Sequence, residues 1–193
     1  MLGSRLSFLW AAILVCTITG LAVGADDAPK TKAVEIDSFT LNLPESWKQT
    51  DVTSQFRKAQ FEIPAVEDDP EPAELVVYYF GPQGGGGVEA NVQRWVGQFD
   101  PDGREVKATT GESEQGKYVV VDVTGTYNKP IGPPIRQQTK PMPGARMLGV
   151  ILHVAKGGNY FFKLTGPEKT VAQAADAFRA SFGAKADDEK EYE

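Results

Sequence analysis

The sequence predicts one α+β domain in which a central, largely antiparallel sheet is covered by helices on its faces, an α/β/α sandwich. Several segments alternate apolar and polar residues with a period of two, which is typical of strands. Two other segments carry apolar residues at helical spacing. Most neighbouring strands are joined by short connections, which favours antiparallel pairing. About 170 residues follow an apolar leader, enough for one domain with a real core.

The expected strands are short and follow one another closely. In the first, Phe39, Leu41 and Leu43 point to one side of the chain. The residues Lys156-Gly157-Gly158 are typical of a hairpin turn between the last two strands. We expect strands at 39–43, 57–63, 74–80, 104–113, 117–127, 147–154 and 159–164.

Two helices are expected, each with one apolar stripe. The stripe of the first comprises Val88, Val92, Trp95, Val96 and Phe99. The second helix runs from about Pro167 to Phe182, and Gly183 suits its C-terminal stop. Its stripe comprises Val171, Ala174, Ala175, Phe178 and Phe182.

Residues 1–25 are interpreted as a signal peptide. A cationic Arg5 precedes an apolar stretch over 6–23, and Val23-Gly24-Ala25 offers the small residues that a signal peptidase reads. We therefore expect export to the periplasm or outside the cell, with cleavage near Ala25. The alternative is an uncleaved membrane anchor, because the stretch approaches the roughly 18–20 residues that span a bilayer.

After the leader, we expect a linker at 26–34, one globular domain at 35–183 and a charged, disordered tail at 184–193. Cleavage removes Cys16, the chain's one cysteine, so disulfides and thiolate chemistry are excluded from the mature chain. It also removes Arg5, which takes the net charge from −6 to −7. This charge argues against nucleic-acid binding. The single histidine, His153, argues against a histidine-rich metal site, and no cofactor is expected.

Short motifs resemble the PsbP-like fold, which is shared by an oxygen-evolving subunit of the photosystem and by Mog-type Ran-binding proteins. The opening Phe39-Thr40-Leu41-Asn42-Leu43-Pro44-Glu45-Ser46-Trp47 and the closing Phe178-Arg179-Ala180-Ser181-Phe182 carry this resemblance. Segments 73–81 and 160–167 resemble uncharacterised exported bacterial proteins. The resemblance implies a non-enzymatic binding or assembly role and transfers no partner, because fold does not fix function.

A run of four glycines, Gly84, Gly85, Gly86 and Gly87, lies between a strand and a helix, the layout of a phosphate-binding loop. No Lys-Ser or Lys-Thr follows the glycines, and Glu89 already complements the helix dipole. The loop is thus an anion-site candidate whose alternative is a flexible structural connection.

A stretch free of acidic residues extends from Val123 to Pro167. Within it, residues 128–146 read as a long proline-rich loop, and such loops are often functional. We hypothesise that this loop contacts an anionic envelope partner, either a protein, a polymer or lipid headgroups. The alternative is a solvated insertion that balances the acidic remainder. The candidate contact residues are Lys129, Arg136, Lys140 and Arg146.

Three polar residues, Asp122, His153 and Lys163, lie inside otherwise apolar strands. If Val154 pairs with Tyr160, His153 and Lys163 share a face one diagonal step apart, and with Asp122 nearby they are weak candidates for acid–base catalysis. No nucleophile motif accompanies them. The acidic runs 67–72 and 100–103 lack calcium-ligand spacing and are interpreted as turns.

The sequence therefore favours an exported, non-enzymatic binding or assembly module of the cell envelope. A small hydrolase-like enzyme built on Asp122, His153 and Lys163 is the alternative. A third option is a ligand-binding protein that uses a crevice between sheet and helix lined by Trp95 or Tyr79.

Overall fold

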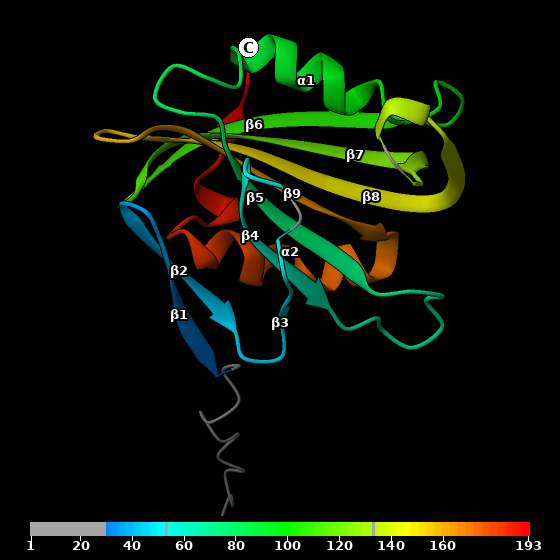
Figure 1. Ribbon diagram of the computed structural model, residues 1–193, viewed down its shortest axis with the longest axis horizontal. Coiled ribbons are helices and arrows are strands. Elements are labelled where there is room, and N and C mark those ends of the chain that lie inside the picture. Colours follow the sequence, from blue (N-terminus) through cyan, green and yellow to red (C-terminus); the bar gives the residue numbers. More distant parts are fainter. Residues whose placement is uncertain (1–29, 53, 133) are drawn as a thin grey trace, which may run out of the picture.

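The computed structural model describes residues 30–52, 54–132 and 134–193, without the side chain of Pro134. The predicted signal peptide and the first part of the predicted linker lie outside these residues. Figure 1 shows the arrangement of the elements. They are, in chain order, β1 (Thr31–Ile36), β2 (Phe39–Pro44), β3 (Lys48–Gln49), β4 (Arg57–Ile63), β5 (Ala73–Tyr79), α1 (Val88–Val96), β6 (Glu105–Ser113), β7 (Gly116–Pro130), the 3-10 turn η1 (Pro134–Arg136), β8 (Thr139–Val154), β9 (Gly158–Pro167), α2 (Glu168–Ser181), η2 (Ala186–Asp188) and β10 (Lys190–Glu191).

An eight-stranded sheet forms the centre of the molecule, in the order β10-β6-β7-β8-β9-β5-β4-β3. Every strand pair in it is antiparallel. The β1–β2 hairpin is a separate two-stranded sheet. The predicted α+β class with a largely antiparallel sheet is therefore confirmed.

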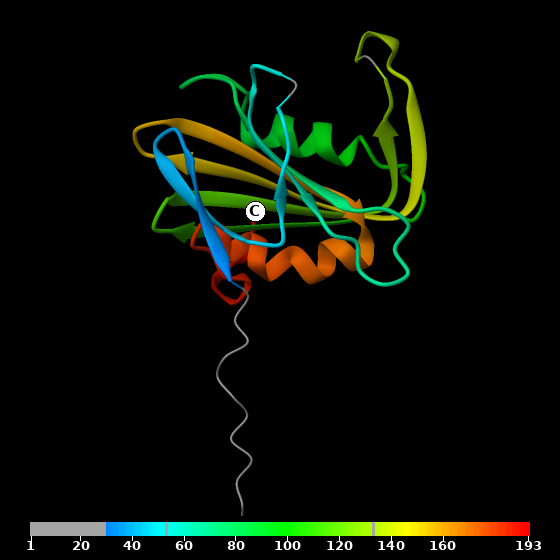
Figure 2. The ribbon, with the colours of Figure 1, turned by 60° about the horizontal axis from the view of Figure 1, so that its bottom comes forward.

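Each face of the sheet carries its own apolar core because successive strand residues point to opposite sides. Val120, Val150 and Phe162 belong to the core that includes α2 and the β1–β2 hairpin. Val121 and Met147 belong to the core that includes Trp95 of α1. Figure 2 shows α1 and α2 on opposite sides of the sheet. We call these two sides the α1 face and the α2 face.

Helix α2 buries its whole predicted stripe, from Val171 to Phe182, at 0 to 7 % exposure. Its N-terminus is capped from a distant loop, because a carboxylate oxygen of Asp69 accepts hydrogen bonds from both the backbone N–H and the hydroxyl of Thr170. A negative charge at this position also complements the helix dipole. The acidic run 67–72 thus stabilises a helix end.

Helix α1 is anchored by Trp95, which is 4 % exposed. Its ring lies directly on Gly149 of β8, where a Cβ atom would approach the ring to 2.5 Å. A glycine in the middle of a strand here permits the close approach of a helix. Helix α1 ends at Val96, short of the expected Phe99, which instead forms a β-bridge with Tyr127.

The predicted linker is wrong in its second half. Residues 31–34 lie in β1, which pairs with β2 over six residues, including Val34 with Leu41. Charged Lys32 and Glu35 interrupt the apolar pattern of this segment, so its strand character depends on the partner strand.

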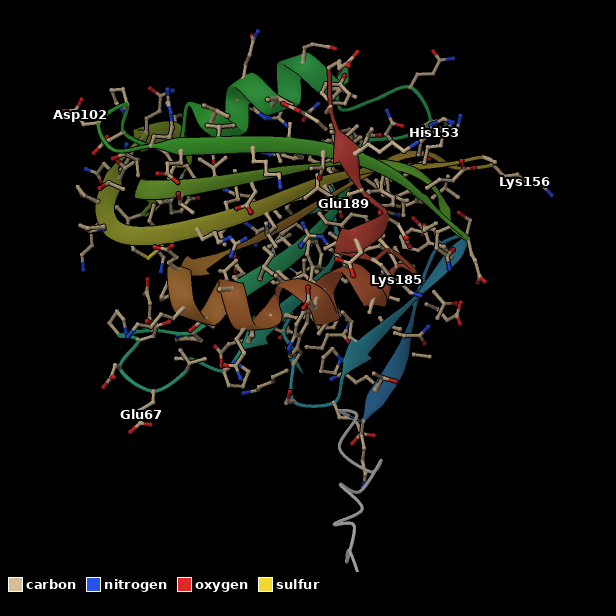
Figure 3. The ribbon with its side chains drawn as sticks, turned by 180° about the vertical axis from the view of Figure 1, so that it is seen from behind. Glu67, Asp102, His153, Lys156, Lys185 and Glu189 are labelled. Atoms are coloured by element: carbon tan, nitrogen blue, oxygen red, sulfur yellow. The ribbon has the colours of Figure 1, made fainter. Side chains whose placement is uncertain are left out.

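The predicted disordered tail is also wrong. Ala184 is buried, and β10 pairs with β6 at the edge of the sheet. Glu189 accepts two hydrogen bonds from the guanidinium of Arg179, and their side chains are only 4 % and 10 % exposed. Figure 3 shows Glu189 between β10 and the end of α2. At least one charged residue of the tail, Glu189, therefore attaches it to helix α2.

The predicted long loop at 128–146 is mostly strand. Strand β7 continues to Pro130 and β8 begins at Thr139, and Lys129 pairs with Lys140 between them. A bulge between Gly125 and Tyr127 bends this hairpin away from the sheet. Its prolines suggested a loop, but edge and bulge positions of a sheet tolerate proline. We call residues 127–142 the arm. Figure 2 shows it rising on the same side as α1.

Candidate functional site

The three candidate catalytic residues do not converge. Asp122 pairs with Leu148, whereas Lys163 pairs with Gly149, the next residue along β8. Because neighbouring strand residues point to opposite faces, Asp122 lies on the α2 face and Lys163 on the α1 face. The sheet separates the two groups, so the predicted catalytic trio is wrong.

His153 shares the α1 face with Lys163, as the alternation predicts, but in a different register. Val154 pairs with Gly158 rather than Tyr160, which places His153 opposite Asn159. The imidazole is exposed and its Nδ1 lies 2.9 Å from the Asn159 side-chain oxygen. Figure 3 shows it near Lys156 at the end of the hairpin. His153 lies four residues along β8 from Gly149, the strand partner of Lys163, which corresponds to about 13 Å.

Asp122 is engaged by Arg146, one of the predicted partner-binding residues. The guanidinium donates to both carboxylate oxygens, at 2.9 and 2.6 Å. This hydrogen bonding raises the pKa of Arg146 above its ordinary value. A bidentate pair of this kind fixes both side chains. Asp122 therefore orients Arg146 against the sheet and is unavailable as a catalytic base.

Lys163 has an unusual environment for a lysine. Its ammonium donates hydrogen bonds to the side-chain oxygen of Gln98 and, at 2.8 Å, to the phenol oxygen of Tyr127. It also lies 4.7 Å from the centre of the Tyr127 ring, a cation–π contact. It forms no salt bridge with any carboxylate of the described residues. Burial lowers the pKa of Lys163 to about 8, while Glu74 raises it more weakly.

Lys163 lines a cleft of about 460 Å³ on the α1 face. Val76 and Gln60 extend the same row of the sheet, since Val76 pairs with both Lys163 and Gln60. The arm forms the opposite wall through Tyr127, Lys129 and other residues. The volume is within the range of small-molecule sites. We call this hollow the Lys163 cleft.

Two hydroxyl groups in the Lys163 cleft have no partner. The hydroxyl oxygens of Thr165 and Thr50 are buried and make no hydrogen bond within the described residues. Thr165 lies two residues after Lys163 and therefore on the same face. Buried polar groups are normally satisfied, so such exceptions point to water or a ligand.

Four other charged groups around the cleft, Arg57, Glu74, Lys129 and Glu71, are paired or linked. Arg57 donates to the side-chain oxygen of Gln60, which in turn donates to Glu74. Lys129 makes a salt bridge with Glu71 at 2.9 Å. Lys163 and Arg57 are thus the two cations of the cleft that form no salt bridge among the described residues, and Arg57 is linked to Glu74 through Gln60.

The phenol of Tyr127 completes the polar group around Lys163. Burial raises its pKa well above the ordinary value, so the phenol stays neutral at physiological pH. Its oxygen accepts from Lys163, and no hydrogen bond within the described residues uses its own proton. Tyr127 can therefore donate into the cleft that it lines.

The four-glycine loop is held by packing and carbonyl contacts. The amide nitrogen of Asn91 donates to the carbonyl oxygens of Gly85 and Gly87, both at 2.8 Å. Gly85 has φ +86° and lies against the ring of Phe161, where a Cβ would come within 2.3 Å. These contacts explain the glycines structurally, and the role as an anion site stays a prediction.

The arm keeps two of the four predicted contact residues free. Lys129 pairs with Glu71 and Arg146 with Asp122, whereas Arg136 and Lys140 are exposed and make no ion pair with a described residue. Ile135 is 91 % exposed and Ile131 is 44 % exposed. The end of the arm therefore presents cations beside apolar side chains.

The crevice expected between sheet and helix is not formed by the residues named for it. Trp95 is buried on Gly149, and Tyr79 stacks on Tyr160, with ring centres 4.5 Å apart, on the α2 face. Neither residue lines the Lys163 cleft. The sequence singled out Lys163 but missed Tyr127, Thr165 and the β4–β5 wall. The polar residues at 163 and 165 within an aromatic strand were the available signal.

In the described ranges, no group of acidic, histidine or cysteine side chains has the arrangement of a metal site. No helix in those ranges has both the length and the apolar character needed to cross a membrane.

No protein-family model and no curated protein sequence matches the chain. Among solved structures, it is similar to the PsbP protein (CyanoP) of the cyanobacterium Synechocystis, with a TM-score of 0.48 and 12 % identity, over 88 % of this chain and 96 % of that one. It is also similar to PA94 of Pseudomonas aeruginosa, described as a protein of unknown function and putative regulator, with a TM-score of 0.42 and 13 % identity, over 78 % and 92 % of the two chains. The first match is to the PsbP-like class that the sequence motifs indicated. The likeness concerns the course of the chain, and no function is drawn from it.

Proposed function

We propose that this chain is an exported, non-enzymatic binding or assembly module of the cell envelope, built on a PsbP-like α/β/α sandwich. Export rests on the leader at 1–25, which combines a cation, an apolar stretch and a small-residue cleavage site. The observation that carries the binding role is the free end of the arm. The hydrolase alternative is not retained, because its three residues lie apart.

The end of the arm has the composition of a contact surface. Arg136 and Lys140 are free of ion pairs within the described chain, and the molecule as a whole is acidic. Ile131 and Ile135 lie beside them, exposed. Basic side chains attract an anionic partner, and exposed apolar groups add area that is buried on contact. This combination supports a partner that is anionic and partly apolar.

A double charge reversal tests this role. Arg136→Glu with Lys140→Glu should weaken binding to an anionic envelope component at least tenfold at low salt, since two attractive contacts become repulsive. The matched control is Lys117→Glu with Lys156→Glu, which changes the net charge equally at exposed positions outside the arm. Equal binding by both double variants would contradict the proposal.

The same assay distinguishes the three sources of anionic charge. The protein is incubated separately with phosphatidylglycerol vesicles, with purified cell-wall polymer and with solubilised envelope proteins. Binding to phosphatidylglycerol vesicles but not to phosphatidylcholine vesicles would identify lipid headgroups as the partner of the arm. Retention by the cell-wall polymer, or by a defined acidic protein, would identify that polymer or that protein as the partner. Failure to bind in all three preparations would overturn the binding role.

Export is tested by the N-terminus of the protein recovered from cells. We expect a chain that begins at Asp26 in the periplasmic or extracellular fraction. A chain that keeps residues 1–25 and sediments with membranes would show the leader to be an anchor.

A further inference from the structure

We propose that the Lys163 cleft binds a small organic monocarboxylate, with the ligand's carboxylate held by the ammonium of Lys163 and the hydroxyl groups of Thr165 and Tyr127. This site is separate from the end of the arm and goes beyond the proposed envelope contact.

The ammonium of Lys163 has no counter-ion among the described residues. A charge removed from water is costly unless it is paired, and Lys163 has only the neutral oxygens of Gln98 and Tyr127 as partners. An ammonium has three N–H donors, so one remains for a ligand. A carboxylate at this point supplies both the missing acceptor and the missing charge.

Two hydroxyl donors of the cleft, those of Thr165 and Tyr127, are unused. The Thr165 hydroxyl is buried without a partner, and the Tyr127 hydroxyl proton has no acceptor within the described residues. Both side chains line the same cleft as Lys163. A carboxylate has about four lone-pair positions and can accept from all three groups at once.

The charge around the cleft selects a monoanion. The cationic side chains of the lining are Arg57, Lys129 and Lys163, and they face three carboxylates, Glu62, Glu71 and Glu74. Lys129 is paired to Glu71, and Arg57 is linked to Glu74 through Gln60. Lys163 is the cation left for the ligand, and the carboxylates Glu62 and Glu74 disfavour a second negative charge. A phosphate dianion is therefore a poorer fit than a carboxylate.

The rest of the ligand is expected to be apolar and short. Val76, Met142, Pro72 and Pro130 line the cleft beside its polar floor. About 460 Å³ accommodates a chain or ring of several carbon atoms beyond the carboxylate. A ligand with one acidic end and an apolar body uses both kinds of surface.

Titrations of the purified protein with three probes test this site. Hexanoate carries the carboxylate, hexanamide has nearly the same shape without the charge, and inorganic phosphate offers a different anion. Binding is followed by NMR through the lysine ¹³Cε signals and the backbone amides. We expect hexanoate to shift the Lys163 and Thr165 signals in a saturable way, with at least tenfold higher affinity than either hexanamide or phosphate.

Variants tie the response to the cleft. Lys163→Met should weaken hexanoate binding at least tenfold, and Thr165→Val should weaken it less, since a neutral hydrogen bond contributes less than a charged one. The control Lys156→Met, at an exposed turn, should bind like the parent.

Three outcomes would overturn the inference. They are no saturable response to hexanoate, equal affinity for hexanoate and hexanamide, and full hexanoate binding by Lys163→Met. A phosphate response stronger than that of hexanoate would overturn the choice of a monocarboxylate. Because the arm assay uses Arg136 and Lys140, neither result depends on the other.

Discussion

The ammonium nitrogen of Lys163 lies 2.8 Å from the phenol oxygen of Tyr127, and this contact joins the sheet to the base of the arm. Both partners are shifted by burial, which lowers the pKa of Lys163 and raises that of Tyr127. Each shift disfavours the charged form. Lys163 is charged at neutral pH, so its burial is a stability penalty there, whereas the phenol of Tyr127 is neutral in the folded and unfolded chain and bears none. Binding sites commonly show such a penalty, because groups reserved for a ligand are imperfectly satisfied without it.

Replacing Lys163 by Met should stabilise the protein at neutral pH. The pKa of Lys163 is about 8 in the folded chain against 10.5 for an ordinary lysine, so the unfolded state binds more protons between these values. Stability of the parent therefore rises as the pH increases from 8 to 10.5. We expect Lys163→Met to raise the free energy of unfolding by about 1–2 kcal/mol at pH 7 and by much less at pH 11.

Urea unfolding at pH 7, 9 and 11 measures this difference. The charged groups that act on Lys163 are Glu74 from β5, Arg57 from β4 and Arg94 from α1, and they are the same in both proteins. A Lys163→Met variant that is less stable than the parent at pH 7 would show that the lysine is a structural element.

Gly149→Ala should destabilise the packing of α1 on the sheet. The new Cβ would lie 2.5 Å from the Trp95 ring, so the helix must move. Overpacking of this kind typically costs about 1–3 kcal/mol. Thermal unfolding with Trp fluorescence reports both the loss and the change around Trp95. Gly87→Ala is the control, since its Cβ meets nothing closer than 3.9 Å. Similar losses in both variants would argue against the close approach.

Glu189→Gln should lower the free energy of unfolding by about 2–4 kcal/mol, because it leaves the nearly buried guanidinium of Arg179 without its anionic partner. Glu191→Gln, at an exposed position two residues later, should have little effect. Chemical unfolding of the two variants measures the difference. Equal stabilities would mean that residues 184–193 are not attached as the structure has them.

Asp69→Ala should lower the free energy of unfolding by about 1 kcal/mol through loss of the α2 cap. Glu67→Ala removes a neighbouring exposed charge and serves as the control. Hydrogen exchange at the first turn of α2 localises the effect. Unchanged protection of the Thr170 amide in the Asp69 variant would disprove the cap.

The local pattern predicted much of the fold because strand alternation and helical stripes are local properties. The α2 stripe and the shared face of His153 and Lys163 follow directly from periodicity. The register does not, since the turn pairs Val154 with Gly158 and so moves His153 away from Lys163. A two-residue change of register leaves the faces unchanged, and alternation alone cannot detect it.

The cleft could not be predicted from the sequence because it depends on which strands become neighbours. Lys163 meets Val76 only because β9 pairs with β5, and it meets Tyr127 only because a bulge turns the arm. Both are tertiary features. The sequence did single out Lys163 as a charged residue inside an aromatic strand, and the structure places it in the lining of a cleft.

The pKa of Lys163, measured through its ¹³Cε chemical shift without and with saturating hexanoate, decides whether the Lys163 cleft holds a carboxylate. Without ligand, we expect a pKa of about 8 for Lys163. A bound carboxylate favours the charged ammonium, so the pKa should rise by at least one unit and hexanoate affinity should fall as the pH passes above 8. A pKa near 10.5 without ligand, or one that hexanoate leaves unchanged, would contradict the proposed carboxylate site.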